Sequence, residues 1–451
     1  MEQQTTNHQQ EQTDNIITIV LTADNHLGYA ISSQHPRKRE ELRQRLRHAF
    51  QQATDFAVGQ GVDLFMQAGD LFDTAHPDEQ DRSFVAARLA QLRQAGIRVF
   101  ALGGVHDTPR LSDLLNTEED AIPTPQMSYA RLGALHYFPP GRSTGHTSTA
   151  DAHHAEQFGS ETHTMQPVML DVRGTLVGIC GVGVLAGQQG DPLGHIRIDS
   201  DIERAALSLL LLHAPIEGIT TGALGLDAQA QVIHASIMAL PAFQAVLAGY
   251  HHGFKRQSIG RSEVVVAGAT QHIDFSDPDD EPGFVFLGIA ADGVRWCRHI
   301  SVDSIQLRRL VIDVADLSSD QSPTSLVLER LRPLCTEDTM VQLRLEGELT
   351  RQHYHELNLN QLRLYGEKHA FALAIDDSGL TFLPDEREGD KSGQDASRAS
   401  EVEERLSLRE ELIRLADEWI AAAEEEQEQR ALVATKEELL AALWGTTLHP
   451  T

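Results

Sequence analysis

Short apolar runs alternate with helical repeats along the first hundred residues of the chain. The runs ITIVLT, at 17–22, VDLFMQA, at 62–68, and IRVFAL, at 97–102, predict buried strands. Between them, apolar residues recur at helical spacing over 36–60 and 79–95. Strands that alternate with helices predict βαβ units and a largely parallel sheet that is covered on both faces.

Further strands are predicted in the middle of the chain. They lie in MLDVRGTLVGICGVG, LSLLLLH, AVLAG, SEVVVAGAT and GFVFLGIA. The tetrapeptides DVRG, at 171–174, and AADG, at 290–293, supply hairpin turn chemistry. The polar insertion 140–166 has no periodicity and contains several histidines. We interpret it as a solvated surface loop, with a histidine-rich metal tract as the alternative.

The pattern changes after residue 300. The pattern there predicts a small α+β domain. Its strands are expected in QLRRLVIDVADL, MVQLRLEGEL and FALAIDDSGLTFL, and its helices near 322–334 and 355–363. We therefore expect five segments, and the first domain is of the α/β class. They are a disordered tail at 1–15, an α/β domain at 16–300, an α+β domain at 301–382, a charged linker at 383–404 and a helical segment at 405–447.

The helical segment carries two sequence signatures of helix N-termini. Ser407 and Glu410 form one capping box, and Thr435 and Glu438 form another. Apolar residues follow each box at helical spacing. Two amphipathic helices beyond a linker cannot bury their apolar faces alone, which favours a partner surface. Docking on the rest of the same chain is the alternative.

Composition describes an ordinary globular protein of 451 residues, with 41% hydrophobic and 23% charged positions. No apolar stretch is long enough to span a membrane, and the polar, Gln-rich start does not resemble a signal peptide. The 3 cysteines are widely spaced, without a CxxC pair. They favour reduced thiols and a cytoplasmic location over a disulfide framework.

The formal net charge is −29, which by itself disfavours a nucleic acid partner. Much of the acidic charge lies after residue 375, however, while a basic cluster lies near the start of the first predicted helix. A DNA substrate is therefore not excluded, provided that its contacts are local. The cluster could equally be the solvated face of a helix. Its members are Arg37, Lys38, Arg39, Arg43, Arg45 and Arg47.

Metal-ligating residue types follow five of the predicted strands. The motifs are Asp24-Asn25-His26, Gly69-Asp70-Leu71-Phe72-Asp73, Gly104-Val105-His106-Asp107, His213 after LSLLLL, and Gly249-Tyr250-His251-His252. In open α/β sheets, sites form beyond the carboxyl ends of the strands, so these side chains are expected to converge. Carboxylates and imidazoles suit Mn, Fe or Zn rather than a thiolate site.

Such a set fits phosphodiester hydrolysis, which needs an activated water, neutralised oxyanion charge and a proton for the leaving alkoxide. Two metal ions that share a carboxylate meet the first two needs. Asp70, in a Gly-Asp turn, is the natural bridge, and Asp24 and His26 can reach one ion from a single loop. His106 can act as general acid, with Asp107 beside it to orient it or to hold its protonated form.

On these motifs the chain resembles the calcineurin-like metallophosphoesterases, and within them the SbcD-type DNA double-strand-break repair nucleases. The resemblance spans ADNHLGY, VDLFMQAGDLFDTAHP, AGIRVFALGGVHD, LLLLHAPIEG and VVVAGATQHIDFSDPDDEPGFVFLGI. It implies a sandwich of βαβ-built sheets flanked by helices, a small α+β capping domain that faces DNA, and a C-terminal helix pair. It also implies a homodimer, and an SbcC-like coiled-coil ABC-type ATPase bound through 405–447.

The resemblance also implies the roles of individual residues, with Mn²⁺ as the favoured divalent metal. The first ion would be held by Asp24, His26, Asp70 and His252, the second by Asp70 and His213, and His106 would donate the proton. Two positions depart from the family pattern. Where the family motif GNHD has Asn, this chain has Val105. Where the family motif GHxH has its first His, this chain has Tyr250.

Three functions therefore compete. The first is a nuclease subunit of a DNA repair complex with a weakened second metal site. The second is a metal-binding scaffold of the same type of complex, which Val105 and Tyr250 motivate. The third is a phosphoesterase for substrates other than nucleic acids, which the cap-like domain and the terminal helix pair disfavour.

Overall fold

We describe the protein from a computed structural model. The chain forms two compact units, Met1–Ser304 and Ile305–Thr451. The predicted tail up to residue 14, most of the insertion 140–166, the linker 383–404 and nearly all of 405–447 lie outside the described residues. The structure describes residues 15–31, 35–108, 124–139, 163–184, 189–219, 229–240, 243–317, 322–349, 354, 356–382 and isolated positions between 413 and 436.

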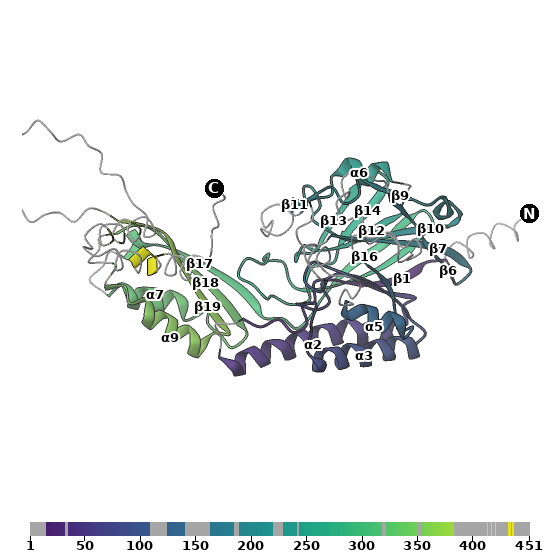
Figure 1. The fold of residues 1–451 in the computed structure, drawn as a ribbon. Coiled ribbons are helices and arrows are strands. Elements are labelled where there is room, and N and C mark those ends of the chain that lie inside the picture. Colours follow the sequence, from purple (N-terminus) through teal and green to yellow (C-terminus); the bar gives the residue numbers. More distant parts are fainter. Residues whose placement is uncertain are drawn as a thin grey trace, which may run out of the picture. The chain divides into compact units, whose positions relative to one another are not determined.

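The first unit is built on two six-stranded sheets (Figure 1). In the first sheet the strand order is β16-β15-β1-β2-β3-β4. Strands β1 to β4 run parallel, as the alternating pattern predicted, and the hairpin of β15 and β16 adds an antiparallel edge. The bounds are β1 Ile17–Thr22, β2 Leu64–Ala68, β3 Arg98–Leu102, β4 His136–Phe138, β15 Gly283–Ala290 and β16 Gly293–Ser301.

Three helices pack on the outer side of this sheet: α2 (Pro36–Gln60), α3 (Glu79–Gln94) and α5 (Pro125–Arg131) (Figure 1). Helix α2 buries an apolar stripe that includes Leu42, and it stops where Gly61 adopts a left-handed conformation with φ of 62°. The predicted helix over 36–60 is confirmed, and the one predicted over 79–95 ends at Gln94.

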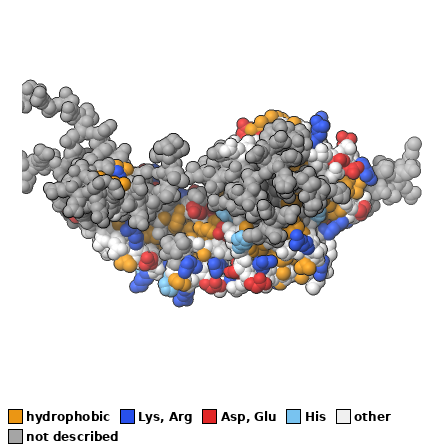
Figure 2. Space-filling model, viewed as in Figure 1, with side chains coloured by type: hydrophobic (Ala, Val, Ile, Leu, Met, Phe, Trp, Pro, Cys, Tyr) orange, Lys and Arg blue, Asp and Glu red, His pale blue; other side chains and the backbone are white. Residues whose placement is uncertain are grey.

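Three of the six basic residues predicted as a cluster on α2, Arg43, Arg45 and Arg47, form ion pairs within the unit. Arg47 forms a buried ion pair with Asp81, at 2.9 Å, and Arg45 contacts Glu41 at 2.8 Å. Acidic and basic side chains are interspersed on the face that Figure 2 presents. These arginines are therefore engaged in holding α2 against α3 and in ordinary surface pairs, which favours the alternative of a solvated helix face.

The second sheet has the order β13-β14-β12-β10-β7-β6, with β7, β10, β12 and β14 parallel. Apolar side chains from both sheets form one core between them, including Ile19, Met66, Ile179, Leu209 and Leu247. The DVRG turn joins β6 and β7 as an antiparallel hairpin, as predicted. The bounds are β6 Val168–Val172, β7 Thr175–Gly183, β10 Leu207–His213, β12 Ala245–Gly249, β13 Lys255–Ile259 and β14 Ser262–Val266.

Smaller elements complete the described part of the first unit. A second apolar cluster covers the outer face of the second sheet, where helix α6 contributes Ile237. These elements are β5 His163–Met165, β8 Gln189–Gly190, β9 Ile196–Ile198, η3 Ser200–Arg204, β11 Gln229–Ala230 and α6 His234–Ala239. The unit is thus a two-sheet sandwich flanked by helices, which is the predicted fold class.

The second unit holds a three-stranded parallel sheet in the order β17-β18-β19. A separate apolar core, which includes Leu343 and Leu362, joins the sheet to its helices. The last helix begins four residues later than predicted from 355–363, because Asn358 caps it by accepting a hydrogen bond from the Gln361 amide. The bounds are β17 Gln306–Asp313, η4 Val314–Leu317, α7 Pro323–Leu331, β18 Thr339–Leu349, α9 Leu359–His369 and β19 Ala372–Phe382. No described helix is long and apolar enough to cross a membrane.

Candidate metal centre

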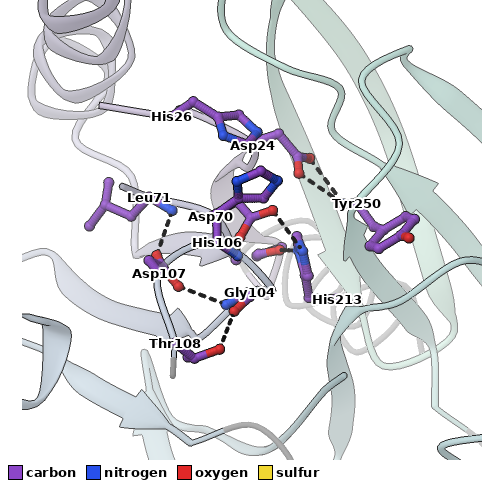
Figure 3. A network of polar contacts seen from close by, with 12 residues as sticks. Asp24, His26, Asp70, Leu71, Gly104, His106, Asp107, Thr108, His213 and Tyr250 are labelled. Atoms are coloured by element: carbon purple, nitrogen blue, oxygen red, sulfur yellow. Dashed lines mark hydrogen bonds and ion pairs between the residues drawn. The ribbon is translucent and has the colours of Figure 1, made fainter. Parts of the chain in front are cut away.

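The predicted ligands lie together where strands of both sheets end. Asp24 and His26 follow β1, Asp70 follows β2, His213 is the last residue of β10, and His252 follows β12. Figure 3 shows Asp24, His26, Asp70, His106 and His213 turned toward one another. Their donor atoms form three groups, and in each group the atoms lie within 4.8 Å of one another. The groups are Asp24, His26 and His252; Asp24, Asp70 and His213; and His26, Asp70 and His106.

The loops that carry these residues have unusual backbone conformations. Asp24, His26, Asp70 and Tyr250 all have positive φ angles, between 45° and 87°. Such conformations are unfavourable for residues other than glycine and concentrate at functional sites. Backbone hydrogen bonds hold the first two loops in register, with the amide of Asn25 donating to the carbonyl of Asp70 at 2.8 Å. The sheets therefore fix where the carboxylates of Asp24 and Asp70 lie.

Two glycines let these loops approach each other. A Cβ atom at Gly104 would overlap with the carboxylate and backbone amide of Asp70. A Cβ atom at Gly249 would overlap with the carbonyl of Ala68 and the Ala23 side chain. Both glycines belong to the motifs found in the sequence, so the motifs include residues that serve packing as well as chemistry.

Three histidines are anchored in the same way, through Nδ1. His252 Nδ1 lies 2.6 Å from Asp277 Oδ1, His26 Nδ1 lies 3.2 Å from Asp73 Oδ1, and His213 Nδ1 lies 2.7 Å from the Ala68 carbonyl. Each partner is an acceptor only, so Nδ1 carries the hydrogen in each ring. In the neutral form, Nε2 of each ring therefore presents a lone pair.

The Nε2 atoms point into the cluster. His26 Nε2 and His252 Nε2 lie 3.3 Å apart. His213 Nε2 lies 3.2 Å from Asp70 Oδ2, yet it is buried and makes no hydrogen bond of acceptable geometry among the described residues. Lone pairs that face each other or a carboxylate repel unless a cation lies between them. The donor set therefore fits a divalent metal bound by imidazoles and carboxylates.

Electrostatics support the need for positive charge here. Burial alone would lower the pKa of His213, but the negative charge of Asp70 raises it to about 9. Burial would likewise lower the pKa of His252, but Asp277 raises it to about 9. The pKa of Asp70 falls below its usual range because His213 outweighs the effect of burial. The raised pKa values of His213 and His252 show that the surrounding carboxylates favour positive charge at the centre.

The Asp24 carboxylate is fixed from the β12 side. The amide of Tyr250 donates to both of its oxygens, at 3.1 and 3.0 Å. Asp24 is 2% exposed, and burial is the main reason why its pKa is raised. A buried carboxylate with one donor and several histidine neighbours is stabilised further by a bound cation.

His106 is the most accessible member of the cluster, with its side chain 48% exposed. Its backbone amide donates to Asp70 Oδ1 at 2.8 Å, which places the ring over the edge of the centre. The ring contacts His26 edge-on, with centroids 4.7 Å apart. The carboxylate that faces the His106 ring is that of Asp73, 3.6 Å from its Nδ1.

Asp107 lies behind the loop. Its carboxylate accepts hydrogen bonds from the amides of Gly104 and Leu71, both at 2.8 Å, and from the side chain of Gln126. Burial and the nearby charge of Asp70 raise the pKa of Asp107 to about 7. Asp107 thus ties the loops after β2 and β3 to α5, whereas the sequence suggested that it orients His106.

Val105 and Tyr250, the two departures from the family pattern, pack against the apolar cluster on the outer face of the second sheet. The Tyr250 ring lies edge-on to His213, with centroids 5.5 Å apart (Figure 3). His251 is half-buried, and Lys255 and Asp280 are among the charges that it senses. Around His213, the centre therefore has an apolar wall where additional ligands were expected.

Two residues that contact the centre were not singled out as site residues from the sequence: Asp73 and Asp277. Asp73 belongs to the Gly-Asp-Leu-Phe-Asp motif, so its spacing from Asp70 was available as a signal. Asp277 lies in the acidic run Ser276–Asp280, where nothing in the sequence distinguishes it from its neighbours. Only the folded chain brings it to His252.

Parts of this chain are similar in sequence to known proteins. Residues 17–167 match the family described as Calcineurin-like phosphoesterase. The DNA double-strand break repair protein Mre11 of Halobacterium salinarum is 24% identical over 337 residues, which cover 73% of this chain and 70% of that protein. The Mre11 protein of Haloferax volcanii is 24% identical over 330 residues, which cover 73% of this chain and 61% of that protein.

Among solved structures, a putative 5'-nucleotidase from Staphylococcus aureus aligns over 71% of this chain and 59% of its own, with 13% identity and a TM-score of 0.34. Residues 17–167 of this chain are thus similar in sequence to the calcineurin-like phosphoesterases. The similarity to the two Mre11 proteins bears out the predicted resemblance to DNA double-strand-break repair proteins.

Proposed function

We propose that the protein is a metal-dependent DNA nuclease that hydrolyses phosphodiester bonds. The observation that carries the proposal is the convergence of two carboxylates and three imidazole Nε2 atoms at the carboxyl ends of strands from both sheets. The name of the Mre11 relatives, DNA double-strand break repair proteins, supports DNA as the substrate.

Asp24, His26, Asp70 and His252 would hold one divalent ion, with Mn²⁺ as the metal that we propose. Asp70 and His213 would contribute to a second ion, and the grouping of Asp24 with both supports a shared pocket. Such ions polarise a phosphoryl oxygen and lower the pKa of a water molecule that attacks it. The carboxylates and imidazoles provide hard and borderline ligands that suit Mn²⁺.

His106 is proposed as the proton donor to the leaving oxygen. Its ring is half-exposed at the edge of the centre, where a substrate can reach it. Asp73 faces the Nδ1 atoms of both His26 and His106, at 3.2 and 3.6 Å. One carboxylate therefore links a metal ligand to the proton donor, while Asp107 keeps the intervening loop in place.

We further propose that the second ion binds weakly. Val105 has no lone pair to offer, and Tyr250 directs its ring against His213 within an apolar cluster. A phenol has a pKa of about 10, so it ionises at neutral pH only if a bound cation lowers that pKa. The loss of one ion would remove several kcal/mol of transition-state stabilisation, or about a hundredfold or more in rate.

The same two residues support the scaffold as a second candidate function. In that case the first ion stabilises the loops, and the protein holds DNA or a partner without cutting. The partners that we propose in either case are DNA, an SbcC-like coiled-coil ATPase bound through 405–447, and a second copy of the chain. Deletion of 401–451 is expected to abolish co-purification with such an ATPase, and unchanged co-purification would contradict that assignment.

The test of function is digestion of end-labelled duplex and single-stranded DNA by the purified protein with Mn²⁺. Digestion is expected for the native protein and not for His106→Ala. Intact DNA from a protein with bound Mn²⁺ would contradict the nuclease and support the scaffold. Digestion by His106→Ala at the native rate would contradict the assigned proton donor.

A further inference from the structure

Asp277 makes the shortest of the contacts that anchor the three histidines. Its Oδ1 lies 2.6 Å from His252 Nδ1, and its side chain is 5% exposed. It comes from the segment between β14 and β15, 25 residues beyond His252. No metal-ligating role follows from this position, because Asp277 contacts the outer nitrogen of the ring while Nε2 faces the cluster.

The other oxygen of Asp277 is held by its own turn. The amides of Ile273 and Asp274 donate to Oδ2 at 2.8 and 3.1 Å. The Asp277 amide in turn donates to the Asp274 carbonyl at 3.3 Å. A carboxylate with one oxygen committed to two backbone donors cannot rotate without losing both, so its orientation is fixed before any ligand binds.

Because a carboxylate oxygen only accepts, Oδ1 of Asp277 requires a hydrogen on His252 Nδ1. The ring then presents Nε2 to the cluster, in the direction of His26 Nε2 at 3.3 Å. Asp73 stands in the same relation to His26, at 3.2 Å, but it is more exposed, at 26% against 5%. Of the two carboxylates, Asp277 is therefore the more tightly constrained.

We propose that Asp277 is a positioning residue of the metal centre, which sets the tautomer and ring direction of His252 and thereby the affinity of the site for a divalent ion. The inference rests on the proposed metal-dependent function. It adds a residue outside the five strand-end motifs to the machinery of the site. Carboxylates that orient metal-bound histidines commonly change metal affinity about 10- to 100-fold when they are removed.

Asp277→Asn tests this role, because an asparagine amide cannot accept hydrogen bonds both from the Ile273 and Asp274 amides and from His252 Nδ1. If the asparagine side chain directs its oxygen toward the Ile273 and Asp274 amides, its NH₂ group faces His252 Nδ1. The Nδ1 atom must then accept a hydrogen bond. The hydrogen of a neutral ring then moves to Nε2, where it blocks the metal. With the amide reversed, two backbone donors face an NH₂ group, and the turn is destabilised.

Asp274→Asn is the matched control. Asp274 lies in the same turn and also carries a negative charge, but its carboxylate accepts from the Ser276 amide, which an asparagine oxygen can replace. Mn²⁺ affinity would be measured by competition with a chromophoric chelator. The thermal midpoint of the metal-free proteins would be measured in parallel. Histidine-labelled protein would be studied by ¹⁵N NMR, above the pKa of the ring.

We expect Asp277→Asn to bind Mn²⁺ about 10- to 100-fold more weakly and to move the His252 hydrogen to Nε2, while Asp274→Asn matches the native protein. Native affinity in Asp277→Asn would overturn the inference and leave the proposed function intact. If the native protein and His252→Ala bind the same number of Mn²⁺ ions, the proposed metal site itself fails. If Asp277→Asn does not fold, the inference is tested on the native protein by ¹⁵N NMR. A hydrogen on Nε2 of His252 in the native protein would overturn the inference.

Discussion

The Nε2 atoms of His26 and His252 lie 3.3 Å apart, although 226 positions separate them in the chain. Both rings are tied outward by a carboxylate, so neither is free to turn its lone pair away. The arrangement brings together a loop after β1 and a loop after β12, which belong to different sheets. A cation between the two nitrogens relieves their repulsion, and this relation links the stability of the first unit to metal binding.

Added Mn²⁺ is therefore expected to raise the midpoint of thermal unfolding. A ligand that binds only the folded state stabilises it by about 2.7 kcal/mol at a free concentration of about a hundred times its Kd. The measurement is differential scanning fluorimetry or calorimetry at increasing Mn²⁺, with a chelator-treated sample as the reference. His252→Ala should abolish most of the shift. His251→Ala is the matched control, because His251 belongs to none of the three donor groups found among the described residues, and it should keep the shift.

Restoring both missing ligands should increase the affinity of the second site for Mn²⁺. The double variant Val105→Asn and Tyr250→His supplies an amide oxygen and an imidazole next to Asp70 and His213. We expect the stoichiometry to rise from one tightly bound Mn²⁺ to two, and DNA cleavage to rise by about a hundredfold. Equilibrium dialysis with metal analysis, alongside the cleavage assay, checks both. A variant that folds, yet binds no additional ion, would show that Val105 and Tyr250 do not explain the weak site.

Because the loops after β2 and β3 approach closely at Gly104, a larger residue there is expected to lower the stability of the protein and its affinity for Mn²⁺. Gly104→Ala places a Cβ atom against the Asp70 carboxylate and amide, so either the loop or the ligand must shift. We expect a loss of about 1–3 kcal/mol in the free energy of unfolding and impaired Mn²⁺ binding. Gly59→Ala on α2 is the control, because its Cβ would meet nothing within 4 Å, and its stability should be unchanged or slightly higher. Equal effects of the two variants would argue against crowding at the centre.

The cysteines are expected to be unreactive in the folded protein. Burial raises the pKa of Cys180 to about 12 and the pKa of Cys297 to about 11, and burial also raises the pKa of Cys335. A raised thiol pKa leaves the neutral thiol dominant at about pH 8, and reactivity increases only as the pH approaches the shifted value. Labelling with a chromogenic disulfide reagent should be slow in buffer and should reach three thiols in guanidinium. Rapid labelling of the folded protein at Cys180 would contradict its burial in β7.

The pattern of apolar residues was sufficient to predict the parallel strands and the strand ends that meet, while the two-sheet sandwich was implied by the family resemblance. Apolar runs such as those of β1 and β10 end directly before or at a ligand-type residue, and buried parallel strands leave a continuous apolar pattern that is easy to detect. The order of motifs then indicated which residues converge. The helix at Leu359–His369 was displaced in the prediction because the capping Asn358 outweighed the apolar periodicity that precedes it.

Contacts between polar side chains were harder to predict. Asp277 reaches His252 only because the segment between β14 and β15 folds back on the loop after β12, and no periodicity reports such a return. The arginines of α2 appeared as a basic cluster because the acidic partner Asp81 lies 34 positions beyond Arg47. Asp107 adjoins His106 in sequence, but its carboxylate is directed to the Gly104 and Leu71 amides, because adjacent residues in a loop need not share a face.

The most direct measurement is the anomalous difference density at the manganese absorption edge from crystals of the full chain grown with Mn²⁺. A strong peak among Asp24, His26, Asp70 and His252, with a weaker one beside His213, is the predicted result. A well-ordered centre without a peak in that pocket, while Mn²⁺ appears elsewhere on the protein, would contradict the account.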